Sequence, residues 1–511
     1  MMKEKNIFLI SITVGATLVL SLILAFVFKD AKAALWGLLF IPAIVVSFRS
    51  PRLGLLALLI YLPLGNTLAF SLVKVYKVVG NMIKFNGSYP LFKLAKDAFY
   101  FPALAGILYK NSSWGDLRPK IKHLTIAVGF LALSSLLTFF IVNLLQGRGG
   151  FSVGFIGLKT ILGYLPLILC GYYLIQKIED VWIVNRLLIT LVVICCGLTL
   201  IQYVLLSQGI CPDNEVLNKT KALVDLSRTK FYPSIIDKVT LKAQCFVGGS
   251  LLYNPAKNLI RLSGTFSDPW QWGWFLISSS FITYGGSFSE SRRGWRVLGW
   301  VAMAGVLICA IISGQRIALL LVPLIYIVLL VITETRRNLL GIKLALIALL
   351  GISLATGVGA VQNSIASLID RWNYSPPLQF MLGQLHWVTN RLSLFGNGLG
   401  VATSGARQFA GEEGTRLIET YYVKLLYEIG IVGFIAFMSV VTVITILTFK
   451  AYRSIKDPAL RLWGLCLWVF ILFISYNPYY YPLAVEPVSV YYWLFAGILL
   501  KLPELEEETQ S

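Results

Sequence analysis

The chain has 511 residues, of which 57% are hydrophobic and 13% are charged, whereas soluble domains average about 25% charged residues. This composition excludes a soluble globular enzyme, and the mean hydropathy of +0.76 favours many membrane spans over a single anchor. Lysines and arginines total 44 against 24 acids, a net charge of +20, which suits nucleic acid, an anionic lipid surface or an anionic substrate, and the placement of the charges decides between them.

The first apolar run covers residues 6–28, directly after a short basic start. No small-residue cleavage site follows it, so we interpret it as a retained span rather than a signal peptide. Thirteen further runs have the length that a bilayer requires: 34–48, 53–73, 95–109, 124–142, 156–175, 181–206, 270–284, 297–312, 317–333, 342–361, 420–449, 462–476 and 488–500. The sequence therefore predicts an all-α polytopic bundle of about 12–14 transmembrane helices.

The basic residues gather in alternate loops, as the positive-inside rule requires when the N-terminus is cytoplasmic. The predicted inner loops carry Arg49 and Arg52; Lys110, Arg118, Lys120 and Lys122; Arg292, Arg293 and Arg296; Arg336, Arg337 and Lys343; and Lys450, Arg453, Lys456 and Arg461. We expect both ends of the chain in the cytoplasm. The acidic segment 504–508 agrees with this, because acids contribute little to the rule.

Two predicted outer segments are long, at residues 207–269 and 362–419, and loops of that size are usually functional or disordered. The second contains tryptophans and a glycine cluster, which predicts an ordered, partly helical cap. Cys211 and Cys245 share the first loop, where they can either pair in a disulfide or stay free. The other five cysteines lie in spans as small apolar packers, and no spacing of cysteine or histidine predicts a metal site.

The glycines Gly396, Gly398 and Gly400 do not form a nucleotide-binding loop, because they neither follow a strand nor end in Lys-Ser or Lys-Thr. We interpret this run as a tight backbone feature. The alternative is that its amides face a ligand.

Two arginines lie near membrane depth, where ionisable residues are costly and usually functional. Arg261 precedes a span, and Arg316 lies at the outer junction of two apolar runs. Two guanidinium groups at one depth suit a pyrophosphate, because each planar fork can bind phosphate oxygens bidentately. Snorkelling to lipid headgroups is the alternative for both, and pairing with Asp268 is a second alternative for Arg261.

Glu419 lies at the outer mouth of the span that begins at residue 420. It can act as a general base on a sugar hydroxyl, or it can simply stabilise a helix start. Glu412 and Glu413 in the same loop compete for the catalytic role. Glu428 lies deeper and is expected to pair with Lys424, four residues before it.

In their order and spacing these segments resemble the O-antigen ligase and polymerase superfamily, multi-span glycosyltransferases that use lipid-linked sugars outside the cytoplasmic membrane. Three patches carry the likeness: Arg-Leu-Ser-Gly-Thr-Phe-Ser-Asp-Pro from Arg261, Ser-Gly-Gln-Arg-Ile-Ala around Arg316, and the stretch from Arg371 through the glycine run and Glu419 to residue 433. The resemblance covers about residues 261–449. We expect this core to follow N-terminal spans at 1–260, including the outer loop 207–260, and to precede C-terminal spans at 450–511.

The resemblance implies an inverting transfer that needs neither metal nor cofactor. Arg261 and Arg316 would hold the diphosphate of an undecaprenyl-type donor, and Glu419 would activate the acceptor. The remaining substrate-binding candidates are Arg371, Arg391, Tyr421, Tyr422 and Trp372, although aromatic residues at span ends also serve as interface anchors. The expected partners are an undecaprenyl diphosphate-linked glycan, membrane lipid, a flippase and a chain-length regulator, not nucleic acid, in a bacterial inner membrane with the active face outside the cytoplasm.

Three activities remain open from the sequence. The ligases of this superfamily have a histidine where the span here begins with Glu419, so the polymerase branch is favoured. A ligase that transfers glycan to a lipid or protein acceptor is the second interpretation. The third is a small-anion transporter whose path the arginines line, which the absence of an internal repeat in the sequence disfavours.

Overall fold

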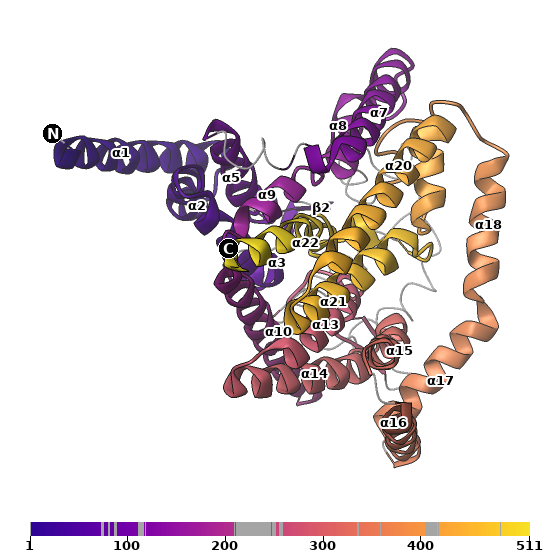
Figure 1. Cartoon of the computed structure of the whole chain (residues 1–511). Coiled ribbons are helices and arrows are strands. Elements are labelled where there is room, and N and C mark those ends of the chain that lie inside the picture. Colours follow the sequence, from indigo (N-terminus) through magenta and orange to yellow (C-terminus); the bar gives the residue numbers. More distant parts are fainter. Residues whose placement is uncertain are drawn as a thin grey trace. The chain divides into compact units, whose positions relative to one another are not determined.

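The structure is a computed structural model of the chain. It describes all residues except 1, 73–75, 80–81, 86–88, 111–116, 118, 209, 211–246, 248–251, 255–258, 335–336, 358, 404–415, 417, 481 and 511. Each of the fourteen apolar runs predicted from the sequence coincides with helix over most of its length (Figure 1).

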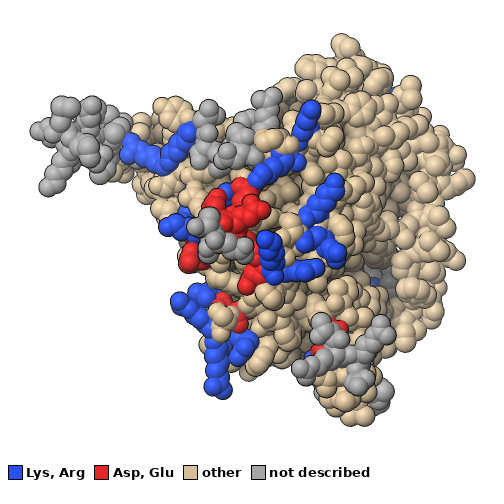
Figure 2. Space-filling model, in the orientation of Figure 1, with Lys and Arg blue, Asp and Glu red and all other residues tan. Residues whose placement is uncertain are grey.

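Ten helices in the described residues are long and apolar enough to cross a membrane, and Val14–Phe28 and Leu339–Leu349 are shorter apolar helices. The chain is thus an all-α, multi-pass membrane bundle, as predicted. Large apolar side chains such as Phe26 and Leu349 are exposed on these helices, as surfaces that face lipid require. In Figure 2 the charged side chains gather in patches, and wide areas between them carry neither acid nor base.

The chain folds into two compact units, each drawn from two stretches of sequence. Unit 1 comprises Met1–Lys110 and Trp182–Ser367, and unit 2 comprises Asn111–Val181 and Leu368–Ser511. These units differ from the three consecutive segments expected from the sequence, at 1–260, 261–449 and 450–511.

Unit 1 is built from helices and two short antiparallel hairpins. In chain order its elements are α1 (Met2–Phe28), α2 (Ala31–Arg49), α3 (Pro51–Leu72), β1 (Tyr76–Val79), β2 (Met82–Phe85), α4 (Tyr89–Leu94), α5 (Asp97–Tyr109), most of α10 (Ile178–Ser207), β3 (Leu252–Asn254), β4 (Leu259–Arg261), α13 (Pro269–Ser289), α14 (Arg293–Ile312), α15 (Arg316–Thr333) and α16 (Arg337–Gly357). Strand β1 pairs with β2, and β3 pairs with β4.

Aromatic contacts hold the first helices of unit 1 together. The buried ring of Phe40 on α2 meets Tyr61 of α3 and Phe92 of α4 edge to face, with ring centroids 5.6 and 6.2 Å apart. Asp30 starts α2 by accepting a hydrogen bond from the Lys32 N–H at 3.0 Å. Helix α13 packs against both α14 and α15, which positions the segments that carry Arg261 and Arg316.

Unit 2 contains the other helices. They are α7 (Lys122–Thr138), the π-helix η1 (Phe139–Leu145), α8 (Gly150–Leu162), α9 (Leu167–Leu174), α18 (Pro377–Thr389), α20 (Tyr421–Ser454), α21 (Pro458–Tyr476), η4 (Pro482–Ala484) and α22 (Val488–Gln510). Helix α17 (Gly359–Tyr374) contains the boundary between the units. The predicted outer segment 362–419 includes α18 and most of α17, so it is partly helical as expected.

Helix α22 is the most buried span of unit 2 and packs against α9, α20 and α21. Its approach to α9 is close: a Cβ at Gly171 would lie 2.0 Å from the Leu494 carbonyl oxygen, and one at Gly497 would lie 2.0 Å from that of Ile168. Small residues at such crossings let two membrane helices pack backbone to backbone.

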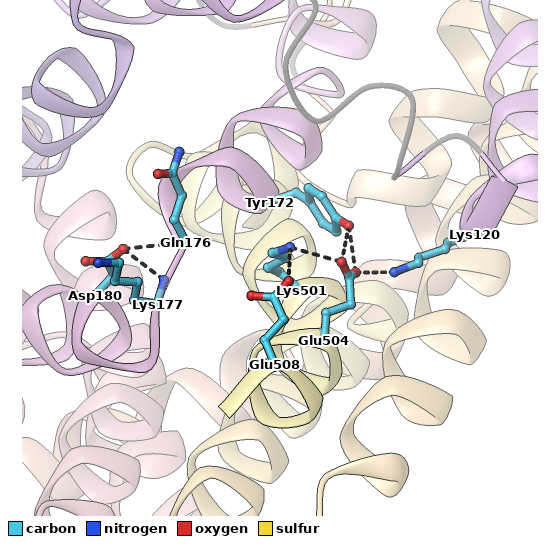
Figure 3. A network of polar contacts seen from close by, with 8 residues as sticks. All are labelled: Lys120, Tyr172, Gln176, Lys177, Asp180, Lys501, Glu504 and Glu508. Atoms are coloured by element: carbon cyan, nitrogen blue, oxygen red, sulfur yellow. Dashed lines mark hydrogen bonds and ion pairs between the residues drawn. The ribbon is translucent and has the colours of Figure 1, made fainter. Parts of the chain in front are cut away.

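The end of α22 is tied down by a polar network (Figure 3). The Glu504 carboxylate accepts hydrogen bonds from the Tyr172 hydroxyl and from Lys501 Nζ at 3.0 Å, and it forms an ion pair with Lys120. Glu506 accepts from the Lys456 N–H at 2.8 Å. The acidic end of the chain therefore joins basic loops that the sequence analysis places on the same side of the membrane.

Candidate functional site

The segments that carry Arg261 and Arg316 adjoin within unit 1. Arg261 ends β4, and Arg316 is the first residue of α15 after a turn of three residues, 313–315, that follows α14. The Leu262 N–H donates to the Ser313 carbonyl oxygen at 3.0 Å. Both arginine side chains are half-buried. The two arginines proposed from the sequence to share one ligand are thus carried by backbone segments that are in contact.

The turn after Arg261 is buried and fixed to its neighbours. Leu262 is fully buried beside Leu206 and Ile312, and the Gly264 N–H donates to Gln202 Oε1 at 3.1 Å. Phe266 and Trp272 pack with ring centroids 6.1 Å apart. This packing holds the turn that follows Arg261 against α10, α13 and α14.

Three buried N–H groups around this turn have no hydrogen-bond partner among the residues that the structure describes: Gln202 Nε2, Trp272 Nε1 and Gln315 Nε2. They come from α10, from α13 and from the residue before α15. The side chain of Gln315 faces Gly273, where a Cβ would lie 3.4 Å from Gln315 Cβ. Buried donors are nearly always bonded, so the arginine junction has spare donors for an oxygen-rich ligand.

Glu419 belongs to unit 2 and is half-buried directly before α20. The residues beside it are fixed: the Thr420 N–H donates to Gln384 Oε1 at 3.0 Å, and the Tyr421 N–H donates to the Tyr480 carbonyl oxygen at 2.7 Å. The Glu419 carboxylate makes no hydrogen bond or ion pair with any described residue. Within the described part of the chain, both oxygens of this carboxylate thus remain available as hydrogen-bond acceptors.

The other predicted sugar-contacting residues differ in exposure. Tyr421 is buried and packs against Phe437 with centroids 5.7 Å apart, so it belongs to the core of unit 2. The partly buried Tyr422 donates its hydroxyl proton to the Ser475 carbonyl oxygen. Trp372 on α17 is 56% exposed and can offer a stacking face. Arg371 lies on the same helix, and its side chain is outside the described part.

Lys424 and Glu428 are both buried on α20, one turn apart. The hydrogen bonds of the Glu428 carboxylate come from the neighbouring loop: Oε1 accepts from the Ala402 N–H at 2.8 Å and from Thr403 Oγ1 at 3.1 Å. Glu428 thus holds the loop at residues 402–403 in place, so we assign it a structural role.

The glycine run at 396–400 is a tight backbone feature that fits into a kink of α20. Gly430 has φ 69° and ψ −170° inside the helix, a region that only glycine occupies readily. The kink frees the carbonyl of Tyr427, which accepts from the Asn397 N–H at 2.8 Å, and the N–H of Val432, which donates to the Leu394 carbonyl at 3.3 Å. Irregular backbone within a span is satisfied internally in this way.

A pocket of about 430 Å³ adjoins this loop within unit 2. It is lined by Ile141, Val142, Gln146, Arg148, Arg391, Leu392, Ser393, Phe395, Gly396 and Asn397. The predicted residue Arg391 lies over the Trp387 ring, with its guanidinium carbon 4.2 Å from the centroid. Arg148 Nη1 donates to Asn397 Oδ1 at 2.9 Å. The pocket therefore combines one arginine that the sequence analysis chose and one that it did not.

Several predicted residues lie outside the described residues, namely Cys211, Cys245, Glu412 and Glu413. The five cysteines predicted to pack inside spans are buried: Cys170, Cys195, Cys196, Cys309 and Cys466. Within the described part of the chain, no three histidine, cysteine or acidic side chains gather as a metal site would require.

Sequence reasoning missed three features of unit 2. Asn143 follows directly on the apolar run 124–142 and lies inside the span Lys122–Leu145, and an amide at membrane depth is a signal in itself. Arg148 lies between glycines in a predicted outer turn, where the positive-inside rule disfavours a basic residue. Glu486, which accepts a hydrogen bond from the Tyr164 hydroxyl, had no distinguishing sequence pattern.

No known family model matches the chain, and no curated protein is detectably similar to it.

Proposed function

We propose that this protein is a glycosyltransferase of a bacterial inner membrane that polymerises undecaprenyl diphosphate-linked oligosaccharide units into O-antigen or exopolysaccharide. The observation that carries the proposal is the hydrogen bond from Leu262 to Ser313, because it joins the two arginine-bearing segments in one unit. Two arginines carried by adjoining backbone segments are suited to a diphosphate, whose oxygens accept bidentate hydrogen bonds.

The unpartnered donors support the same ligand. Gln202 Nε2, Trp272 Nε1 and Gln315 Nε2 are buried around the arginine junction without partners in the described residues. A diphosphate-linked sugar offers many acceptor oxygens, so it would satisfy these groups. A purely apolar lipid tail would leave them unsatisfied at a cost of about 1–3 kcal/mol each.

The reaction is a single displacement at the anomeric carbon of the donor sugar. The acceptor hydroxyl oxygen forms the new glycosidic bond, and the bond from the anomeric carbon to the diphosphate oxygen breaks with its electron pair leaving on the lipid diphosphate. Arg261 and Arg316 stabilise that charge, and a general base takes the hydroxyl proton, a role for which Glu419 stays the candidate from the sequence. One displacement inverts the configuration.

The proposed topology puts both chain ends in the cytoplasm and the reaction on the opposite side. The pattern of basic loops supports this topology. Contacts between segments predicted to be cytoplasmic support it as well: Lys110 Nζ donates to the Arg49 carbonyl at 2.9 Å in unit 1, and Lys120 pairs with Glu504 in unit 2. A lipid-linked donor used outside the cytoplasm needs a flippase, and the product length needs a regulator, so both are proposed partners.

The test is reconstitution of the full chain in lipid with an undecaprenyl diphosphate-linked oligosaccharide, followed by separation of products by length. The natural sequence is compared with Arg316→Ala, Glu419→Gln and Arg461→Ala, the last an exposed arginine of α21. A ladder of longer lipid-linked glycans, absent in Arg316→Ala and kept in Arg461→Ala, is expected. Donor consumption only after addition of a second lipid or protein acceptor would indicate a ligase. A folded chain that consumes no donor would overturn the proposal.

A further inference from the structure

The pocket of unit 2 has the size and chemistry of a ligand site. Its volume of about 430 Å³ lies within the range of about 300–1,000 Å³ that small-molecule sites occupy. Amide and hydroxyl groups of Gln146, Ser393 and Asn397 line it together with the apolar Ile141 and Phe395. Such a mixture suits a ligand with hydroxyl groups and a ring face.

The pocket carries two positive charges and no negative charge among its lining residues. Arg148 and Arg391 both line it, and none of its ten lining residues is acidic. Neither guanidinium forms an ion pair within the described part of the chain. Arg148 uses one N–H on Asn397 Oδ1, and Arg391 uses one on the Trp387 carbonyl oxygen at 3.0 Å. Each arginine has five N–H donors, so most remain for an anionic ligand.

Both arginines are held in place before any ligand binds. Asn143 is fully buried, and its Nδ2 donates to the Arg148 carbonyl oxygen at 2.9 Å and to the Leu399 carbonyl oxygen at 3.1 Å. The Asn143 side chain therefore clamps the Arg148 turn to the glycine run. Arg391 is fixed by its contact with the Trp387 ring. Rigid side chains lose less entropy on binding, which favours recognition.

The position of these arginines also requires an explanation. The turn at 146–150 and the segment 391–400 both belong to predicted outer loops, which the positive-inside rule keeps poor in lysine and arginine. Arg416, also in the second loop, lies near the same tryptophan, 6.0 Å from its centroid. Three arginines on the outer side argue for an anionic ligand there.

We propose that this pocket binds an anionic sugar residue, with Arg148 and Arg391 holding its carboxylate or phosphate group. The polar side chains of Gln146 and Ser393 favour a sugar over a lipid headgroup. That the sugar belongs to the acceptor glycan rests on the proposed function. The binding itself does not, since every residue involved is separate from Arg261, Arg316 and Glu419.

The test is calorimetric titration of the full chain in discs of phosphatidylcholine. The probes are a tetrasaccharide containing glucuronic acid, its carboxyl-reduced neutral counterpart, glucose 6-phosphate and inorganic phosphate. We expect at least one anionic sugar to bind more tightly than both the neutral sugar and inorganic phosphate, with affinity that falls as salt increases. Arg148→Ala and Arg391→Ala should each weaken binding by about tenfold or more.

Two sets of variants keep the result decisive. Arg148→Lys and Arg391→Lys retain the charge without the planar fork, so intermediate affinity is expected, and Arg461→Ala should bind like the natural chain. Equal binding of charged and neutral sugars, equal binding of inorganic phosphate and the anionic sugars, or displacement of the sugar by phosphatidylglycerol in the disc would each overturn the proposal. Arg316→Ala should abolish transfer and keep sugar binding, so failure of the pocket and failure of the proposed function are distinguishable.

Discussion

Leu262 donates its backbone N–H to the carbonyl oxygen of Ser313 at 3.0 Å. Leu262 follows Arg261 directly, and Ser313 lies three residues before Arg316. The bond therefore joins two segments that are far apart in the sequence. It brings the backbone beside Arg261 into contact with the turn that leads to Arg316. We expect these two arginines to act as one diphosphate-binding element.

The first prediction concerns the chemistry of that element. Arg316→Ala should lower kcat/KM for transfer by about 10²–10³, as removal of one charge-stabilising donor does elsewhere. Arg316→Lys should recover part of this loss, because it restores the charge but not the bidentate fork. Initial rates at saturating acceptor measure both effects. Unchanged rates in Arg316→Ala would remove the arginine from the mechanism.

The second prediction concerns the kink of α20. A Cβ at Gly430 would lie 2.3 Å from the Gly396 amide nitrogen and 2.4 Å from the Leu394 carbonyl oxygen, and the backbone conformation there is unfavourable for any other residue. Gly430→Ala should therefore destabilise the protein by roughly 2–5 kcal/mol. A lower Tm in detergent measures this.

Gly129 provides the matched control for the kink. It is an exposed glycine inside α7, and a Cβ there would meet no atom within 4 Å. Gly129→Ala should leave the Tm unchanged or raise it slightly, since alanine is favoured over glycine in a helix by about 1 kcal/mol. Equal losses in the two variants would show that the kink geometry is not responsible.

The third prediction concerns Asn143, which exchanges two hydrogen bonds with Leu399: Nδ2 donates to its carbonyl oxygen at 3.1 Å, and Oδ1 accepts from its N–H at 2.8 Å. Asn143→Leu keeps the size of the side chain but leaves these groups unpaired, at about 1–3 kcal/mol for each. We expect a lower Tm together with weaker binding of the anionic tetrasaccharide, because the Arg148 turn is released.

Ser134 is the control for that substitution. It is buried on α7, and its hydroxyl donates only within its own helix, to the Leu131 carbonyl at 2.9 Å. Ser134→Ala should change neither Tm nor sugar binding appreciably. If Asn143→Leu behaves in the same way, the clamp is not what orders the pocket.

The fourth prediction is a pH dependence at Glu290, which follows α13 and lies outside the spans. Burial alone would raise the pKa of the Glu290 carboxyl, but hydrogen bonds from Arg186 at 2.8 Å and from the Arg292 N–H at 3.1 Å outweigh it. The pKa is thus lowered on folding. The ionised Glu290 carboxylate therefore stabilises the folded chain at pH values above its unfolded pKa of about 4.3. This stabilisation is lost as pH falls through its lower pKa in the folded chain.

Thermal unfolding between about pH 3 and 8 checks this sign. Glu290→Gln should be less stable than the natural chain at neutral pH by about 3–5 kcal/mol, because Arg186 loses its buried partner. The difference should shrink at acidic pH. Glu507→Gln, which changes an exposed acid on α22, should be as stable as the natural chain at both acidic and neutral pH. A difference in stability between Glu290→Gln and the natural chain that stays constant with pH would contradict the lowered pKa of Glu290.

Much of the fold was predictable, because a membrane span is set by the length and apolarity of one continuous segment. All fourteen runs coincide largely with helix for this reason. The kink at Gly430 was not predicted, since a glycine within a span is also compatible with a regular helix. That conformation depends on hydrogen bonds with residues 393–397, more than thirty positions earlier.

The site was predictable in part. Arg261 and Arg316 stood out because a charge at the edge of an apolar run is costly, and the structure shows that their backbone segments are joined by a hydrogen bond. Tyr421 shows the opposite: an aromatic residue at a span start looks available from sequence, but packing against Phe437 buries it. The pocket required the Asn143 clamp, which joins residues more than 250 positions apart.

The most direct measurement of the central claim is the amount of undecaprenyl diphosphate released by the purified full chain, counted against the glycosidic bonds formed from the same lipid-linked oligosaccharide. The account predicts one lipid diphosphate for each new bond, and loss of both products in Arg316→Ala while Arg461→Ala retains them. A folded natural chain that binds the donor but releases no lipid diphosphate would contradict the account.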